Sequence, residues 1–94
     1  MNLAYKGKPV IPTKRVLDEL SKIEMDLSEV PDILKQGFRL RKRKNNIIER
    51  AVVKGNKIIN IVAVDLGDYY KIIHAGKFTI NKKFRRLMEN KNEF

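Results

Sequence analysis

The sequence has no cysteine and only one histidine among its 94 residues. Without thiols the chain forms no disulfide and offers no thiolate nucleophile, which fits a cytoplasmic protein. Few ligands remain of the types that transition metals prefer, so we expect no metal site and no cofactor. The sequence also has no phosphate-binding loop, because Lys54-Gly55-Asn56-Lys57 lacks the glycines and the Lys-Ser/Thr ending of that motif.

Long apolar runs are missing as well. No stretch approaches the roughly 20 apolar residues that span a bilayer. The first six residues lack the apolar core of a signal peptide. We therefore expect a cytoplasmic protein with no membrane partner, and its length predicts a single domain over residues 1–94.

Charge of one sign is in excess: 21 Lys and Arg residues stand against 11 Asp and Glu, a formal net charge of +10. This balance favours a polyanionic partner, most often nucleic acid. The alternative is a soluble basic protein from an organism whose proteins are generally rich in lysine. Residues 18–32 hold six acids and one base, whereas residues 35–57 hold nine bases and one acid, Glu49. A general lysine richness does not predict that split.

The centre of the chain predicts a β-meander. Residues 58–64 are mostly β-branched, as in a strand buried on both faces. Residues 46–53 and 69–75 flank them and have similar composition, and residues 78–80 extend or follow the last strand. Gly55-Asn56 and Gly67-Asp68 suit two-residue hairpin loops.

The flanking segments complete an α+β fold. Residues 1–12 indicate an extended arm, residues 13–37 a helical hairpin, residues 38–80 an antiparallel sheet with a basic edge strand at 38–44, and residues 81–90 a C-terminal helix. Thr13 and Ser28 are the expected N-caps, and Gly37 ends the second helix. The prediction is two N-terminal helices packed on a sheet of three to four mainly antiparallel strands, followed by a short C-terminal helix.

Two-residue loops fix which side chains share a face. With these loops Arg50, Ile61 and His74 form one row, and Tyr70 lies on the same side. The opposite side then carries four other polar side chains: Glu49, Asn60, Lys71 and Lys77. A bulge of one residue in either hairpin would move side chains to the opposite face.

The candidate chemistry is cleavage of RNA without a metal. A base takes the 2′-OH proton, cations hold the phosphate charge and an acid meets the leaving oxygen. His74 is the natural acid or base, with Arg50 and Tyr70 beside it as catalytic candidates. The alternatives are that His74 is a hydrogen-bonded strand residue and that Tyr70 simply packs.

Phosphate binding is expected of the exposed cations on the basic edge strand and beyond it. These nucleic-acid-binding candidates are Arg39, Arg41, Lys42, Arg43, Lys44, Lys77 and Lys83. The alternative for residues 39–44 is a solvated strand edge.

The layout resembles the small RelE/ParE-like toxin superfamily. Residues 27–37 are similar to its Ser-x-Glu-Asp-Val-x-x-x-Leu-x-x-Gly segment, and Val62-Ala63-Val64 to its apolar strand. Arg15 stands where short members have a helical histidine, and Glu19 where they have an arginine. The superfamily includes ribosome-dependent mRNA endonucleases, gyrase poisons and proteins without known activity. The resemblance therefore implies an antitoxin protein as partner and leaves the substrate open.

Three functions follow from these observations. The first is a metal-independent mRNA endonuclease of toxin–antitoxin type, acting on RNA that includes ribosome-bound mRNA. The second is a non-catalytic RNA- or DNA-binding protein with the same basic surface. The third is a protein–protein interaction module.

Overall fold

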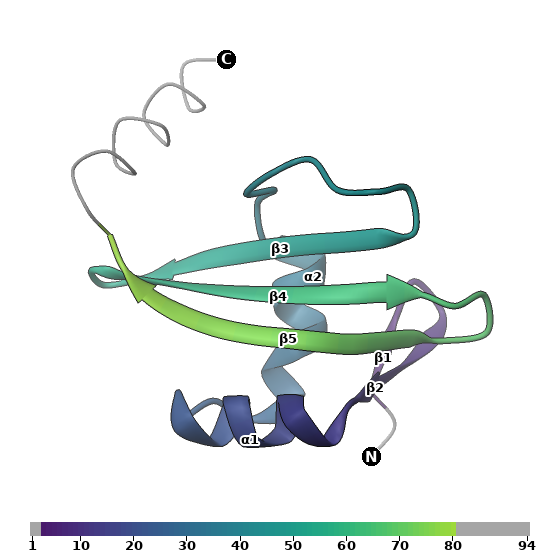
Figure 1. The fold of residues 1–94 in the computed structure, drawn as a ribbon, viewed down its shortest axis with the longest axis horizontal. Helices are drawn as coiled ribbons and strands as arrows, with labels where there is room; N and C mark the ends of the chain where they lie inside the picture. Colours follow the sequence, from purple (N-terminus) through teal and green to yellow (C-terminus); the bar gives the residue numbers. More distant parts are fainter. Residues whose placement is uncertain (1–2, 81–94) are drawn as a thin grey trace.

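A computed structural model describes residues 3–80 of the chain as one curved sheet with two α-helices (Figure 1). The sheet has five strands in the order β1-β2-β5-β4-β3. In chain order the elements are β1 (Ala4–Tyr5), β2 (Lys8–Pro12), α1 (Lys14–Lys22), the 3₁₀ helix η1 (Leu27–Glu29), α2 (Val30–Gln36), β3 (Ile47–Lys54), β4 (Lys57–Asp65) and β5 (Tyr70–Thr79). The predicted α+β class with two helices before the meander is confirmed.

The helix ends follow local signals, with one exception. Thr13 caps α1 as predicted, because its Oγ1 accepts a hydrogen bond of 3.1 Å from the Val16 amide. The second cap is Asp26 and not Ser28. The Asp26 carboxylate accepts from the Ser28 amide, and the Glu29 side chain accepts from the Asp26 amide in a capping box.

Gly37 ends α2 for a reason other than backbone freedom. Its φ of −71° is ordinary for any residue. A Cβ at this position would lie 2.5 Å from the Ile33 carbonyl oxygen and 2.8 Å from that of Ala51. Glycine is needed here because the end of the helix meets the backbone of β3.

The N-terminal segment is more ordered than the predicted extended arm. β1 and β2 form a hairpin through Lys6 and Gly7, which both have positive φ as a tight type I′ turn requires. β2 then joins the meander parallel to β5, with Val10 opposite Tyr70. The sheet therefore has five strands instead of the predicted three to four. It is mainly antiparallel as predicted, because only the pairing of β2 with β5 is parallel.

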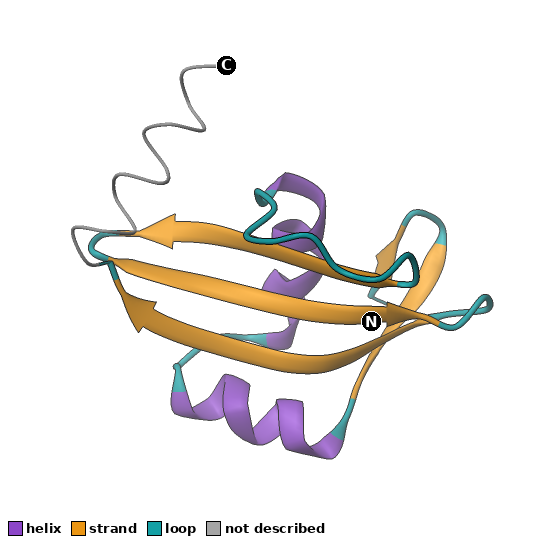
Figure 2. Ribbon diagram, turned by 45° about the horizontal axis from the view of Figure 1, so that its top comes forward, coloured by secondary structure: helices purple, strands orange, loops and turns teal. Residues whose placement is uncertain are grey.

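The predicted basic edge strand at residues 38–44 is wrong except at its first residue. Phe38 forms an isolated bridge to Ala51, with two backbone hydrogen bonds of 2.9 Å. Residues 39–46 leave the sheet as a loop, which Figure 2 shows running in front of β3. Five cations in six residues repel one another in a strand, whereas a loop lets their side chains separate.

Both hairpins begin in the predicted register. Arg50 lies opposite Ile61 across the Gly55-Asn56 loop, and Asp65 lies opposite Tyr70 across the second turn. β5 continues to Thr79, so residues 78 and 79 extend the last strand as predicted.

A bulge then changes the faces of β5. Ala63 pairs with Ile72 but Val62 pairs with His74, so Ile73 is the extra residue. The prediction that His74 faces Ile61 is wrong. His74 joins the row of Glu49, and Lys77 moves to the other side of the sheet.

The helices lie on one side of the sheet. Figures 1 and 2 show α2 behind β3 and β4, and α1 beside β5. The core between these layers includes Val16, Leu20, Leu34, Ile61 and Ile72, all almost fully buried. Both helices among residues 3–80 are too short for a bilayer crossing. The predicted C-terminal helix at 81–90 lies outside the described residues.

Candidate nucleic-acid interface

One face of the sheet has no helix of residues 3–80 packed on it, and we call it the open face. The strand register assigns side chains to it. Its members are Ile47, Glu49, Ala51 and Val53 of β3, Ile58, Asn60, Val62 and Val64 of β4, Lys71, His74, Gly76 and Phe78 of β5, and Ile11 of β2. Although no described helix covers this face, the polar side chains at its centre are buried or half-buried. They are Glu49, Asn60 and His74.

A pocket of about 390 Å³ lies between the 39–45 loop and the edge of β3. We call it the cationic pocket, because seven of its lining residues are basic and only Glu49 and Asp65 are acidic. The basic residues are Lys6, Arg39, Arg41, Lys42, Arg43, Lys44 and Arg50. The structure therefore brings together the five loop cations that the sequence predicted to bind nucleic acid, and adds Lys6 and Arg50.

Glu49 holds the loop against the sheet. Its carboxylate accepts hydrogen bonds from Arg43 Nε and Nη2, both at 3.2 Å, and lies 3.0 Å from Arg41 Nε. The side chain of Glu49 is fully buried, whereas that of Arg41 is 63% exposed. Two guanidinium groups share one carboxylate, so this cluster keeps a net positive charge.

The carboxylate of Glu49 stays ionised despite its burial. Burial alone would raise its pKa, but hydrogen bonds from Arg43 and Asn60 and the charges of Arg41 and Arg43 lower the pKa overall. Asn60 Nδ2 donates to Glu49 Oε2 at 3.1 Å from the neighbouring strand. The anion that fixes the loop is therefore present at neutral pH.

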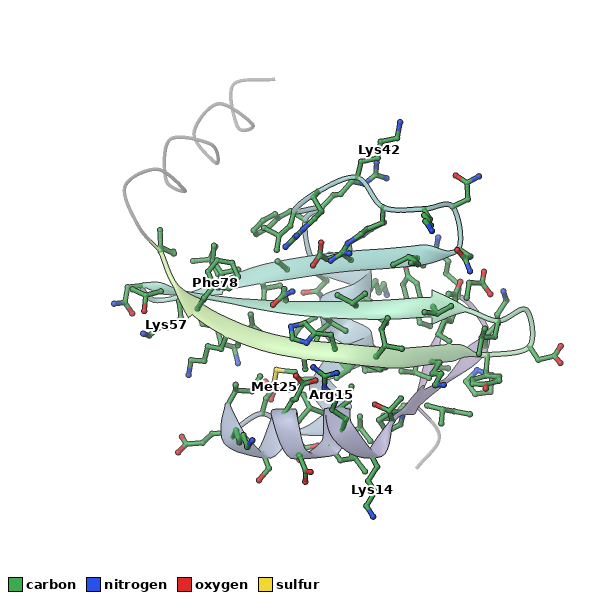
Figure 3. All side chains as sticks on the ribbon, viewed as in Figure 1. Lys14, Arg15, Met25, Lys42, Lys57 and Phe78 are labelled. Carbon is green, nitrogen blue, oxygen red and sulfur yellow. The ribbon has the colours of Figure 1, made fainter. Side chains whose placement is uncertain are left out.

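Backbone contacts also hold the loop at its ends. Phe38 bridges to Ala51 at one end, and the Lys44 carbonyl accepts from the Ile47 amide at the other. Lys42 and Lys44 make no ion pair within residues 3–80, and Lys42 extends away from the sheet (Figure 3). A loop fixed in this way presents its charges at a lower entropic cost on binding than a mobile one.

His74 lies at the other side of the open face, against α1. Its Nδ1 is 3.1 Å from Glu19 Oε2, and Glu19 Oε1 accepts the Ala75 amide at 3.3 Å. Arg15 Nε is 4.0 Å from the same carboxylate, and Figure 3 shows Arg15 reaching from α1 toward β5. A carboxylate on one ring nitrogen orients the imidazole and leaves Nε2 for another contact.

Nε2 of His74 lies above Gly76. A Cβ added at Gly76 would be 2.9 Å from this nitrogen and 2.7 Å from Asn60 Oδ1. The absence of a side chain at Gly76 therefore lets the imidazole and the amide approach each other over β5. In this way polar side chains cross the open face from the cationic pocket to α1.

The three catalytic candidates are not brought together. Arg50 lies in the row of Ile61, on the side opposite to His74, and its Nη1 donates to the Glu49 carbonyl at 2.8 Å. Tyr70 is buried and packs edge-on against Tyr5 with ring centroids 5.2 Å apart. Its position is that of a core residue, although its side chain reaches the wall of the cationic pocket.

The remaining cations lie elsewhere. Lys77 is exposed near the end of β5, beside Lys22 and Lys57, and does not line the cationic pocket. Lys83 lies outside the described residues. Among residues 3–80, no three His, Asp or Glu side chains cluster closely enough to hold a metal ion.

The sequence interpretation missed Glu49, Glu19 and Lys6. A signal for Glu49 was available, because it is the only acid among nine bases in residues 35–57. No local signal pairs Glu19 with His74, since 55 positions separate them and the bulge in β5 decides which way His74 points.

Comparison with known proteins gives no relative from which a function could be carried over: the chain matches no family model, no curated protein sequence and no solved structure.

Proposed function

We propose that this chain is a nucleic-acid-binding protein that holds phosphate groups in the cationic pocket. The observation that carries the proposal is the arrangement of seven basic residues around one pocket, with two of them fixed by the buried carboxylate of Glu49. Arginine and lysine at a fixed concave site suit phosphate oxygens, and contacts to phosphates release counterions. The pocket volume of about 390 Å³ lies within the usual range for ligand sites.

The main competing explanation is that the loop cations only neutralise the carboxylate of Glu49 on the sheet. Among residues 3–80, Glu49 is the only carboxylate that forms an ion pair with Arg41 and Arg43, and it balances one of their two charges. Lys42 and Lys44 add two more charges without an ion pair in the described part of the chain. An excess of this kind destabilises the free protein slightly and is offset when a polyanion binds.

The test compares two double variants with the same loss of charge. Lys42→Ala with Lys44→Ala removes two cations from the pocket, whereas Lys14→Ala with Lys22→Ala removes two exposed cations from α1. Binding of a fluorescent RNA 12-mer is followed by anisotropy from low to high salt. We expect the pocket variant to bind more weakly, with a salt slope smaller by about 1.4, from about 0.7 per phosphate contact on a single strand.

The α1 variant should bind like the wild type. Equal losses in both variants would show that net charge alone is responsible and would refute the pocket. Wild-type binding that does not weaken with salt would refute phosphate binding in the pocket, and the absence of binding would refute nucleic-acid binding altogether.

A second candidate function, metal-independent RNA cleavage, is favoured by the contact between Glu19 and His74. In such a reaction His74 Nε2 takes the 2′-OH proton, the 2′-oxygen attacks phosphorus, and the 5′-oxygen leaves with a proton from an acid or water. The products are a 2′,3′-cyclic phosphate and a free 5′-OH. His74→Ala should abolish cleavage while the cationic pocket still gives salt-dependent RNA binding; cleavage that survives this substitution would show that His74 is not the base.

The likeness to RelE/ParE-like toxins and the antitoxin partner that it implies stay predictions. A protein partner is tested by purifying the chain with the product of a neighbouring gene. A stable complex without nucleic-acid affinity would favour the interaction-module hypothesis instead.

A further inference from the structure

Most of the exposed large apolar side chains of residues 3–80 lie on the open face. Five large apolar side chains are strongly exposed among residues 3–80. Three of them lie on this one face: Ile11 is 46% exposed, Val53 44% and Phe78 37%. Figure 3 shows Phe78 at the end of the sheet, where β5 and β4 meet. Exposed apolar groups that share a face often mark a binding surface.

The arrangement of polar and apolar groups on this face differs from that of a protein interface. Protein interfaces have an apolar centre and a polar rim. Here the centre mixes polar and apolar groups, with Asn60 and His74 in the rows of Ala51 and Val62, and the exposed apolar side chains lie at the two ends of the face. Asn60 is buried and donates to Glu49, whereas the half-buried imidazole of His74 can hydrogen-bond to the edge of an unpaired base, and an aromatic ring can stack on the face of a base.

Positive charge borders the open face on two sides. The cationic pocket lies along β3, and Lys71 lies on β5 beside Ile11. The only carboxylate that the register places on the face is Glu49, which is fully buried and held by two arginines. A single nucleic-acid strand that carries phosphates on one side and bases on the other can therefore place its phosphates against the cations and its bases against the open face.

We infer that single-stranded nucleic acid lies across the open face, with phosphates in the cationic pocket and bases against Phe78 and His74. This inference rests on the proposed function and names its substrate class. A duplex does not meet the requirement, because its bases are stacked and paired and cannot lie on the sheet.

The experiment measures binding of an RNA 12-mer at fixed salt to the wild type and three variants. Phe78→Ala and Phe78→Leu remove the aromatic ring, and the leucine variant keeps most of the apolar volume in case the alanine variant is unstable. Leu17→Ala is the control, because Leu17 is 47% exposed on α1, away from the open face. We expect both Phe78 variants to bind at least fivefold more weakly and Leu17→Ala to bind like the wild type.

A competition experiment shows whether the protein prefers single-stranded RNA to duplex RNA. Unlabelled single-stranded 12-mer should displace the probe at lower concentration than the same sequence as a duplex. Equal competition, together with wild-type affinity of both Phe78 variants, would overturn the inference and leave phosphate binding in the cationic pocket intact.

NMR spectra report whether the face itself is covered. Addition of the 12-mer should shift the amide signals of Asn60, His74 and Phe78. Shifts of these signals by an acidic amphipathic peptide, but not by the oligonucleotide, would overturn the inference in favour of a protein partner.

Discussion

Arg43 donates two hydrogen bonds of 3.2 Å, from Nε and Nη2, to the two carboxylate oxygens of Glu49. Paired contacts of this kind fix the guanidinium plane as well as its position. Glu49 comes from β3 and is fully buried, so the sheet determines where the loop stands. The loop thus depends on one carboxylate that faces away from the hydrophobic core.

The first prediction concerns the charge of Glu49. Glu49→Gln keeps the size of the side chain but removes the anion, which leaves Arg41 and Arg43 without their shared partner. We expect the free energy of unfolding at pH 7 to fall by about 2 kcal/mol, the usual cost of hydrogen bonds to a charged group. Urea unfolding measures the loss. Stability equal to that of the wild type would show that the pair contributes nothing.

The pH dependence of stability gives a second prediction. The pKa of Glu49 is lowered in the fold from its ordinary value of 4.5. Its contribution is therefore present above pH 4.5 and is lost as pH falls through the lower folded-state pKa. Between neutral pH and about pH 3 the wild type should lose more stability than Glu49→Gln.

The control for this prediction is Asp18→Asn, which removes an exposed carboxylate on α1. Its unfolding free energy should follow that of the wild type at every pH. Parallel curves for the wild type and Glu49→Gln would show that another carboxylate causes the loss of stability in acid.

A third prediction follows from the close approach at Gly37. Gly37→Ala places a methyl group against the carbonyl oxygens of Ile33 and Ala51, which are backbone atoms and cannot rotate away. We expect a loss of about 2 kcal/mol from this crowding, together with a weaker bridge at Phe38.

Gly7→Ala is the comparison for Gly37→Ala. Gly7 has open space around it but a φ of +77°, so the substitution costs only the backbone strain, about 1 kcal/mol. Thermal unfolding of both variants ranks the two effects. A Gly37→Ala protein as stable as the wild type would contradict the close contact.

Local sequence signals predicted the parts of the fold that depend on local chemistry. Thr13 caps α1, and the Gly55-Asn56 loop fixes the register of the first hairpin. The parallel pairing of β2 with β5 could not be predicted in the same way. Pro9 and Pro12 flank its apolar pair and favour an edge or a loop, and only contact with β5 overrides them.

The candidate site was predicted in composition and missed in geometry. The loop cations converge on one pocket, as their density suggested. The extra residue Ile73 in β5 then separates His74 from Arg50, because one inserted residue exchanges the two faces of a strand. No feature of the sequence around Ile73 predicts the bulge. With the bulge in place, β5 pairs with β4 while His74 and Ala75 contact Glu19 of α1.

The fourth prediction separates packing from catalysis at Tyr70. Tyr70 is buried against Tyr5, so its ring contributes to the core. Tyr70→Phe keeps the ring and should leave both stability and RNA cleavage close to wild type. Tyr70→Ala should cost about 3 kcal/mol or more in stability. A large loss of cleavage in a stable Tyr70→Phe protein would instead show that the hydroxyl takes part in the reaction.

The last prediction concerns Glu19 as a positioning residue for His74. Glu19→Gln keeps an oxygen for the Ala75 amide but removes the charge beside His74 Nδ1. If His74 is the base, cleavage should fall about tenfold or more, within the range that acid–base catalysis contributes. The loss should fall on kcat with KM little changed, because Glu19 orients the imidazole and does not contact RNA. RNA binding and the unfolding free energy should change little, as in the Asp18→Asn control. An unchanged kcat would show that Glu19 only joins α1 to β5.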